Sequence, residues 1–120
     1  MPSISQQIGM NIEERAFLFL KKQGLHMLEQ NYARKTGEID IIALDHQTLV
    51  FVEVRFRANT HYGYAFQTVN KAKQRRIMNT AKLYLQANKR FQQYTCRFDI
   101  MSASLYNGNL IFEWLQHAFY

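Results

Sequence analysis

Two segments of the chain show the apolar spacing of an amphipathic helix. In residues 11–23 apolar side chains recur every three or four positions, and Gly24 follows as a stop signal. Residues 68–87 carry a similar stripe, in which Ile77 and Ala81 are four positions apart. We therefore expect one helix near the start of the chain and a longer one in its second half.

Five other segments predict β-strands, because β-branched and aromatic residues are enriched there between turn signals. The strongest alternation lies in residues 49–56, where Val50 and Val52 face one side and Glu53 the other. The expected strands are residues 25–30, 38–44, 49–56, 95–103 and 109–115. Only residues 45–47 separate the second strand from the third, so these two should form an antiparallel hairpin. The order α-β-β-β-α-β-β predicts a mixed α/β protein with helices packed on a mixed sheet.

Length and composition limit the class of protein. The 120 residues, 48% of them hydrophobic, suffice for one compact domain over residues 1–120. No stretch resembles a secretory signal or reaches the ~18 consecutive apolar residues of a membrane span, so we expect a cytoplasmic protein without membrane contact. The single Cys96 excludes an internal disulfide and a thiolate zinc cluster.

The charge of the chain favours a polyanionic partner. Lys and Arg total 15 against 9 Asp and Glu, which gives a net charge of +6 and an isoelectric point near 9.6. Such a balance is typical of nucleic-acid-binding proteins, and also of ribosome-associated and membrane-surface proteins. Charge therefore indicates a kind of partner and not a function.

The second predicted strand carries acids at positions that call for an explanation. Strict alternation puts Glu38, Asp40 and Ile42 on one face, and Ile39 and Ile41 on the other. Asp40 therefore shares its face with an apolar residue and should be partly desolvated. A carboxylate in that position needs a hydrogen-bond donor or a bound cation.

Asp40 and Glu53 are 13 positions apart and are joined by the predicted hairpin, so they can meet at one site. Two converging carboxylates suit Mg²⁺, which binds through one or two carboxylates, waters and substrate phosphates. The other interpretation is an ion pair with Arg55 or Arg57 on the sheet face. Glu13, on the core-facing side of the first helix, could join the carboxylates.

The cations of the second predicted helix fall on two sides. Lys73 shares a side with the apolar stripe and should point back toward the carboxylates, where it could bind phosphate. Lys71 and Arg75 fall on the opposite side, where a solvated surface is the simpler interpretation. These cations could still add salt-dependent affinity for nucleic acid. The candidate nucleic-acid contacts are Arg57, Lys71, Arg75 and Arg76.

Two further groups have both structural and functional interpretations. Tyr62 and Tyr64, in a predicted loop over residues 57–66, could stack on unpaired bases or belong to an ordinary surface loop. Asp99 has Arg97 as a same-face neighbour two positions away, which predicts a structural ion pair.

Four blocks, in this order along the chain, resemble the YraN family, an uncharacterised protein family numbered 0102. They are GEIDIIA at 37–43, LVFVEVRFR at 49–57, KQRRI at 73–77 and RFDI at 97–100. The resemblance covers residues 9–115. That family is expected to be PD-(D/E)XK nuclease-like and similar to Holliday-junction resolvases. The resemblance implies a restriction-endonuclease-like fold with an α-β-β-β-α-β core.

Carried over by position, the resemblance implies a metal site. Asp40 and Glu53 would be the metal ligands, and the main-chain carbonyl of Val54 would complete a site for Mg²⁺ or Mn²⁺. Arg55 stands where the nuclease motif has lysine, and arginine keeps its proton, so it would orient the phosphate and stabilise charge. The implied catalytic residues are Glu13, Asp40, Glu53, Arg55 and Lys73.

The leading hypothesis is a Mg²⁺-dependent endonuclease that hydrolyses phosphodiester bonds in DNA rather than RNA, with branched or junction DNA as a candidate substrate. A homodimer would suit a two-fold-symmetric junction. The alternatives are a non-catalytic nucleic-acid-binding module, which Arg55 leaves open, and an interaction protein whose acids form only ion pairs.

Overall fold

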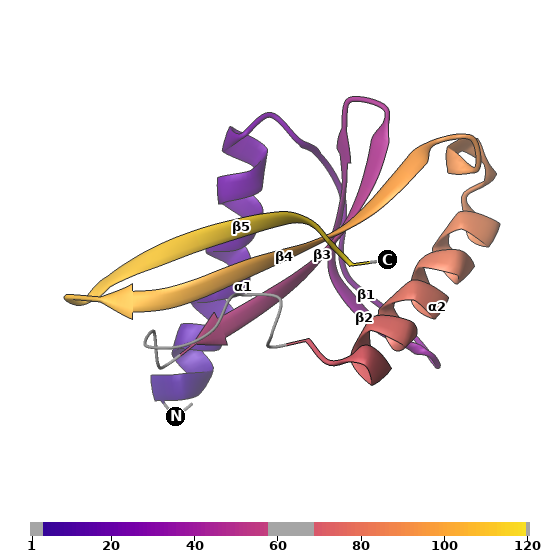
Figure 1. Ribbon diagram of the computed structural model, residues 1–120. Coiled ribbons are helices and arrows are strands. Elements are labelled where there is room, and N and C mark those ends of the chain that lie inside the picture. The colour runs from indigo at the N-terminus through magenta and orange to yellow at the C-terminus, as the bar shows by residue number, and fades with distance from the viewer. Residues whose placement is uncertain (1–3, 58–68, 120) are drawn as a thin grey trace.

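The computed structural model describes residues 4–57 and 69–119 of the chain, with side chains from residue 12 onward (Figure 1). The loop predicted at residues 57–66 lies outside the described residues, apart from Arg57. The predicted order α-β-β-β-α-β-β is confirmed, with one short 3₁₀ helix added. The elements are α1 (Ile4–Lys22), β1 (His26–Arg34), β2 (Gly37–Asp45), β3 (Thr48–Arg57), α2 (Lys71–Ala87), η2 (Lys89–Phe91), β4 (Thr95–Tyr106) and β5 (Asn109–Phe119).

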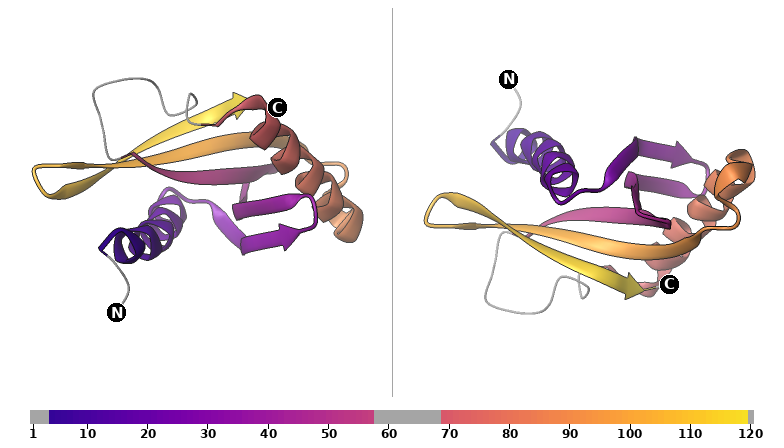
Figure 2. Two further views of the ribbon diagram at one scale, coloured as in Figure 1. Left: turned by 90° about the horizontal axis from the view of Figure 1, so that it is seen from below. Right: turned by 90° about the horizontal axis from the view of Figure 1, so that it is seen from above.

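The strands form one sheet in the order β1-β2-β3-β4-β5. β3 and β4 run parallel and every other neighbouring pair is antiparallel, so the sheet is mixed. A parallel pair needs a long connection, and α2 lies within the connection between β3 and β4. The two views of Figure 2 show α1 and α2 on opposite sides of the sheet. The protein is a mixed α/β fold with the α-β-β-β-α-β order expected of a restriction-endonuclease-like core.

Each face of the sheet buries its own apolar cluster. Phe51 packs with Ile77 of α2 on one face, while Val50 and Val52 pack with Leu20 of α1 on the other. The predicted alternation of β3 is therefore confirmed. Burial of a side chain of this size contributes about 1.5–3 kcal/mol, so the two clusters are enough to hold both helices on the sheet. Neither helix in the described part of the chain is long and apolar enough to cross a membrane.

The alternation fails in β2, at the position of Asp40. Ile42 belongs to the cluster on the α2 face and Ile41 to the cluster on the α1 face. Ile39 also belongs to the α2-face cluster, where it pairs with Tyr32 of β1. The prediction that Ile39 and Ile41 share a face is therefore wrong. Pairing with β3 ends at Ile41, so no ladder hydrogen bonds to β3 hold the backbone at Asp40. The side chains there no longer alternate strictly between the two faces.

Two boundaries differ from the predicted ones for local reasons. β1 continues to Arg34, past its predicted end at Gln30, because it is an edge strand whose exposed polar residues resemble a loop. α2 begins at Lys71 and not at residue 68, because Asn70 caps it. The Asn70 side chain accepts a hydrogen bond of 2.8 Å from the backbone N–H of Lys73.

The turn between β1 and β2 is held against α2. The hydroxyl of Thr80 donates to the carbonyl of Arg76 at 2.9 Å, so the Thr36 hydroxyl is the donor in the 2.6 Å bond between Thr36 and Thr80. Gly37 has a φ of +148°, and a Cβ there would lie 3.4 Å from the Cβ of Arg76. Glycine thus permits this close approach, which fixes the beginning of β2 relative to α2.

Candidate metal and phosphate site

Asp40 lies where β2 and β3 stop pairing. The last pair in their register is Ile41 with Val52, and one further step would set Asp40 opposite Glu53. Instead of a ladder bond, Oδ2 of Asp40 accepts the backbone N–H of Val54 at 2.7 Å. In an extended strand the N–H and C=O of one residue point to the same neighbour, so the Val54 carbonyl is also directed toward β2. The side chain of Asp40 and the main-chain oxygen of Val54 therefore both face the place where the two strands separate.

Glu53 lies on the α2 face of β3 and is 6% exposed. Its Oε1 lies 2.8 Å from Nζ of Lys73 and 3.8 Å from Nη1 of Arg55. The predicted orientation of Lys73 toward the sheet carboxylates is confirmed by this ion pair. A lysine from α2 and an arginine from β3 thus converge on one carboxylate oxygen, beside Asp40.

Asp40 forms no ion pair with a cation of the described ranges. The pKa of Asp40 is raised to about 8, mainly by burial and next by the neighbouring Glu53 carboxylate, while the Val54 N–H opposes the shift. The pKa of Glu13 is also raised, first by burial and then by the charges of Glu38 and Glu53. Acids from α1, β2 and β3 are therefore close enough to repel one another.

Glu38 belongs to this acidic group, although the predicted catalytic set leaves it out. It is exposed on β2, and its charge raises the pKa of both Asp40 and Glu13. Its position two residues before Asp40 is the available sequence signal. That signal is weak, because an exposed glutamate near a hairpin turn is usually an ordinary surface residue.

The donors fit a hard divalent cation better than zinc. In the described part of the chain, no three His, Cys, Asp or Glu side chains are arranged to hold a metal by themselves. A structural zinc site would need four such ligands, whereas Mg²⁺ needs one or two carboxylates and takes its other ligands from water and phosphate. Asp40, Glu53 and the Val54 carbonyl supply a set of this second kind. A bound cation would stabilise the ionised form of Asp40 and lower its raised pKa.

The predicted nucleic-acid contacts are not all on one element. Lys71, Arg75 and Arg76 are exposed along α2. Arg57 ends β3, two residues beyond Arg55, and is partly buried. The structure thus places all four cations on the two elements that also carry Lys73 and Glu53.

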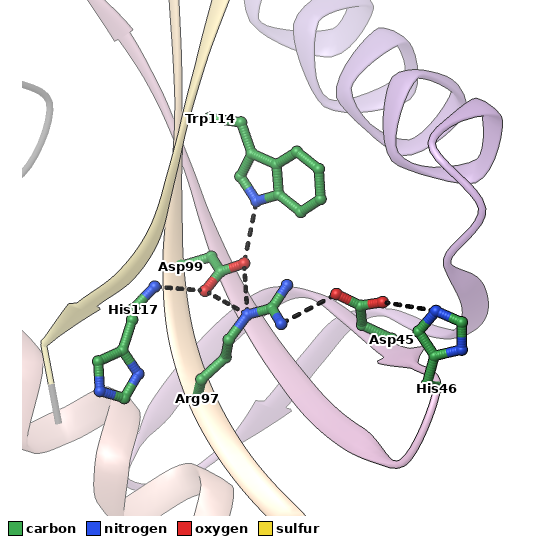
Figure 3. A network of polar contacts seen from close by, with 6 residues as sticks. All are labelled: Asp45, His46, Arg97, Asp99, Trp114 and His117. Atoms are coloured by element: carbon green, nitrogen blue, oxygen red, sulfur yellow. Dashed lines mark hydrogen bonds and ion pairs between the residues drawn. The ribbon is translucent and has the colours of Figure 1, made fainter.

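A second polar network, drawn in Figure 3, is centred on the fully buried Asp99. Nε of Arg97 donates to both carboxylate oxygens of Asp99, at 3.1 and 3.2 Å, so the predicted ion pair is confirmed. Nη1 of Arg97 also lies 2.9 Å from Oδ2 of Asp45. Trp114, which packs in the α1-face cluster, donates its indole N–H to Asp99 at 2.9 Å. This network lies on the opposite face of the sheet from Glu53.

Asp99 also accepts a hydrogen bond from the backbone of β5 at a β-bulge. The register between β4 and β5 shifts between Phe98 and Ile100, and His117 of β5 adopts a φ of +54°. The backbone N–H of His117 donates to Oδ1 of Asp99 at 2.9 Å. Asp99 therefore acts as a structural acceptor that joins β4 to β5. Sequence patterns predicted its partner Arg97 but neither the bulge nor the indole.

Fold and site together define a mixed α/β protein whose sheet brings paired carboxylates next to a lysine from a crossover helix. The chain belongs to the uncharacterised protein family UPF0102, whose model matches residues 12–103. A UPF0102 protein of Pseudomonas savastanoi pv. phaseolicola is 40% identical over 121 residues, covering 99% of this chain and 98% of the relative. One from Francisella tularensis subsp. tularensis is 42% identical over 114 residues, or 94% of each chain. The predicted family is thus confirmed, and its name carries no activity.

Proposed function

We propose that this protein is a divalent-metal-dependent endonuclease that hydrolyses phosphodiester bonds in DNA. The observation that carries the proposal is the convergence of Asp40, Glu53 and Lys73 from β2, β3 and α2. A partly buried group of acids with too little positive charge destabilises a fold, so its presence favours a function that supplies the missing cation. Branched or junction DNA is the substrate class that the family resemblance favours.

Asp40, Glu53 and the Val54 carbonyl would hold Mg²⁺ or Mn²⁺, with Glu13 adding negative charge from α1. A divalent cation held there would polarise the phosphate and lower the pKa of the attacking water. The cation would then neutralise the carboxylates in place of Lys73 and Arg55. This exchange of partners releases two positive side chains for the substrate.

Lys73 and Arg55 would bind the scissile phosphate. The guanidinium of Arg55 keeps its proton and cannot act as a base, so it would orient the phosphate and stabilise the charge of the transition state. Lys73 would supply an ammonium group from α2 where the nuclease motif has a lysine on the strand. The 2.8 Å contact between Lys73 and Glu53 supports this assignment, because the ammonium lies beside a carboxylate that we propose as a metal ligand.

Exposed cations around the site support a polyanionic substrate. The first turn of α2 carries Lys71 and Lys73 and no acid, although cations at a helix N-terminus oppose the helix dipole. Arg34 and Lys35 are exposed at the β1–β2 turn, which is docked onto α2 beside Arg76. Each phosphate that such residues neutralise adds salt-dependent affinity. We assign these cations to the DNA backbone.

A non-catalytic nucleic-acid-binding module is the second candidate function, and Arg55 is the observation that favours it. The strand lysine of the nuclease motif is absent. If Lys73 does not replace it, the site would bind a metal and DNA without turnover. The two candidates differ in cleavage and agree in binding.

Incubation with single-stranded, duplex and four-way-junction DNA tests the proposal, in Mg²⁺, in Mn²⁺ and with a chelator. Asp40→Asn and Glu53→Gln should abolish metal-dependent cleavage, because each removes a metal ligand. Glu29→Gln, which neutralises an exposed acid on β1, is the matched control and should cleave like the wild type. Binding without cleavage in every condition would favour the module. The absence of both would leave an interaction protein.

A further inference from the structure

The α1 face of the molecule carries a pocket that the proposed site does not use. It opens between α1 and β5, has a volume of about 500 Å³, and lies on the opposite face of the sheet from Glu53. This volume falls in the range of about 300–1,000 Å³ that is typical of ligand pockets. The lining residues are the apolar Leu18, Phe19 and Phe112 and the basic Arg15, Lys21 and Lys22.

The apolar floor of the pocket is held in place by ring contacts. The ring of Phe19 lies 5.5 Å from that of Phe112, and 6.5 Å from that of Trp114 in an edge-on arrangement. Leu18 lines the same pocket and is 51% exposed, so its apolar side chain is available to a binding partner. Because the floor is already ordered, binding there would require little loss of side-chain freedom.

The rim of the pocket is formed by basic side chains. None of the described lining residues is acidic, and none of Arg15, Lys21 and Lys22 forms an ion pair within the described ranges. The last turn of a helix favours cations, which accounts for Lys21 and Lys22 in part. The helix dipole does not account for Arg15, which lies about two turns before the end of α1. The rim therefore presents positive charge to a ligand.

We propose that this pocket binds a short acidic peptide segment of another protein. An aromatic or branched aliphatic side chain would lie on Leu18 and Phe112, and neighbouring carboxylates would pair with the three basic rim residues. An apolar ligand would leave the rim unused, and a simple polyanion would leave the floor unused. A second copy of this chain is a poor match, because its 15 basic residues exceed its 9 acidic ones. This inference does not rest on the proposed nuclease function.

Fluorescence anisotropy with the full chain tests the proposal. The probes are labelled decapeptides with four consecutive acidic residues followed by Phe, Trp or Leu, placed either at the free C-terminus or before two glycines. We expect saturable binding with a Kd below about 1 mM for at least one probe, and binding about tenfold weaker when the anchor is alanine. Comparing the two placements shows whether the terminal carboxylate contributes.

Variants of exposed residues locate the site without disturbing the core. Leu18→Gln should weaken binding about tenfold, and Lys22→Gln should weaken it and reduce its salt dependence. Ile111→Gln and Lys82→Gln are matched controls, since Ile111 is 46% exposed on β5 and Lys82 is an exposed lysine of α2. Both controls should bind like the wild type.

Three results would overturn the proposal. The first is the absence of saturable binding by every peptide up to about 1 mM, or equal binding by the alanine-anchored peptides. The second is single-stranded DNA binding that Leu18→Gln abolishes, which would make the pocket a nucleic-acid site. The third is a change in oligomeric state caused by Leu18→Gln in light scattering, which would make it a contact between copies.

Discussion

At Glu53 two cations approach one carboxylate oxygen at different distances. Lys73 lies at 2.8 Å, within hydrogen-bond range, whereas Arg55 at 3.8 Å lies beyond it. Their side chains are 31% and 33% exposed, so both can turn toward a substrate while Glu53 stays buried. Lys73 is therefore the residue on which the proposed chemistry depends most directly.

Replacement of that lysine separates a catalytic cation from a surface cation. Lys73→Ala should lower the single-turnover rate of DNA cleavage by about 100-fold or more, because it removes a charge that stabilises the transition state. Lys82→Ala, at an exposed lysine farther along α2, should change the rate by less than about threefold. Equal rates for the two variants would remove Lys73 from the mechanism.

Cys96 provides a residue-scale test that is independent of the site. Burial raises the pKa of its thiol, so at a given pH it carries less thiolate than a cysteine in the unfolded chain. Alkylation by iodoacetamide should therefore be slower in the native protein than in urea, by about tenfold near pH 8, and should become rapid only at higher pH. Mass spectrometry measures both rates, and equal rates would contradict the burial of the thiol.

At the scale of elements, one polar network joins strands that are distant in the sequence. Arg97 of β4 contacts Asp45 at the end of β2, and Asp99 accepts hydrogen bonds from Trp114 and His117 of β5. This network therefore fixes β5, and with it the pocket wall formed by that strand.

Removal of the central acceptor should destabilise the protein strongly. Asp99→Ala should lower the free energy of unfolding by roughly 3–5 kcal/mol, because the buried Arg97 keeps only Asp45 as a partner and the N–H groups of Trp114 and His117 lose their acceptor. Glu113→Ala, an exposed acid of β5, should change that free energy by less than about 0.5 kcal/mol. Urea denaturation measures both changes. A loss below about 1 kcal/mol for Asp99→Ala would show that the network contributes little to stability.

At the scale of the whole molecule, several acidic side chains lie together although the protein as a whole is basic. The chain has a net charge of +6, yet Glu13, Glu38, Asp40 and Glu53 gather at one point and repel one another. A fold selected for stability alone would mix these acids with its many cations. The conflict between local repulsion and global charge is typical of a functional site.

Neutralising one acid should therefore stabilise the metal-free protein. Asp40→Asn should raise the free energy of unfolding by on the order of 1 kcal/mol near neutral pH, since the amide can still accept the Val54 N–H. The folded pKa of Asp40 is raised from 3.8 to about 8, so the wild type should lose stability from this group as pH rises between these values. The variant should lack that component. Urea denaturation in chelator across this pH range measures the difference.

The same pair of proteins tests the metal. Excess Mg²⁺ should stabilise the wild type by mass action, because the cation binds only the folded site, and should stabilise Asp40→Asn much less. Glu29→Gln should respond to Mg²⁺ like the wild type. An equal response of all three proteins would place any metal binding elsewhere.

Several features of the site could be predicted because they depend on local periodicity. Alternation placed Glu53 and Arg55 on one face of β3, and helical spacing pointed Lys73 toward the sheet. The face of Asp40 could not be predicted in this way, since it depends on where pairing with β3 ends. Glu38 could not be predicted for a related reason. Its effect is electrostatic repulsion of Asp40 and Glu13, which depends on how close β2 and α1 lie in the fold.

By itself the sequence determined the order of the helices and strands, the hairpin of β2 and β3, and the family, because each depends on short-range patterns. The tertiary structure alone decided the order of strands in the sheet, the 2.8 Å contact from Lys73 to Glu53, and the bulge held by Asp99. It also created the pocket between α1 and β5. These features join segments far apart in the chain, and packing, rather than local residue spacing, sets their distances.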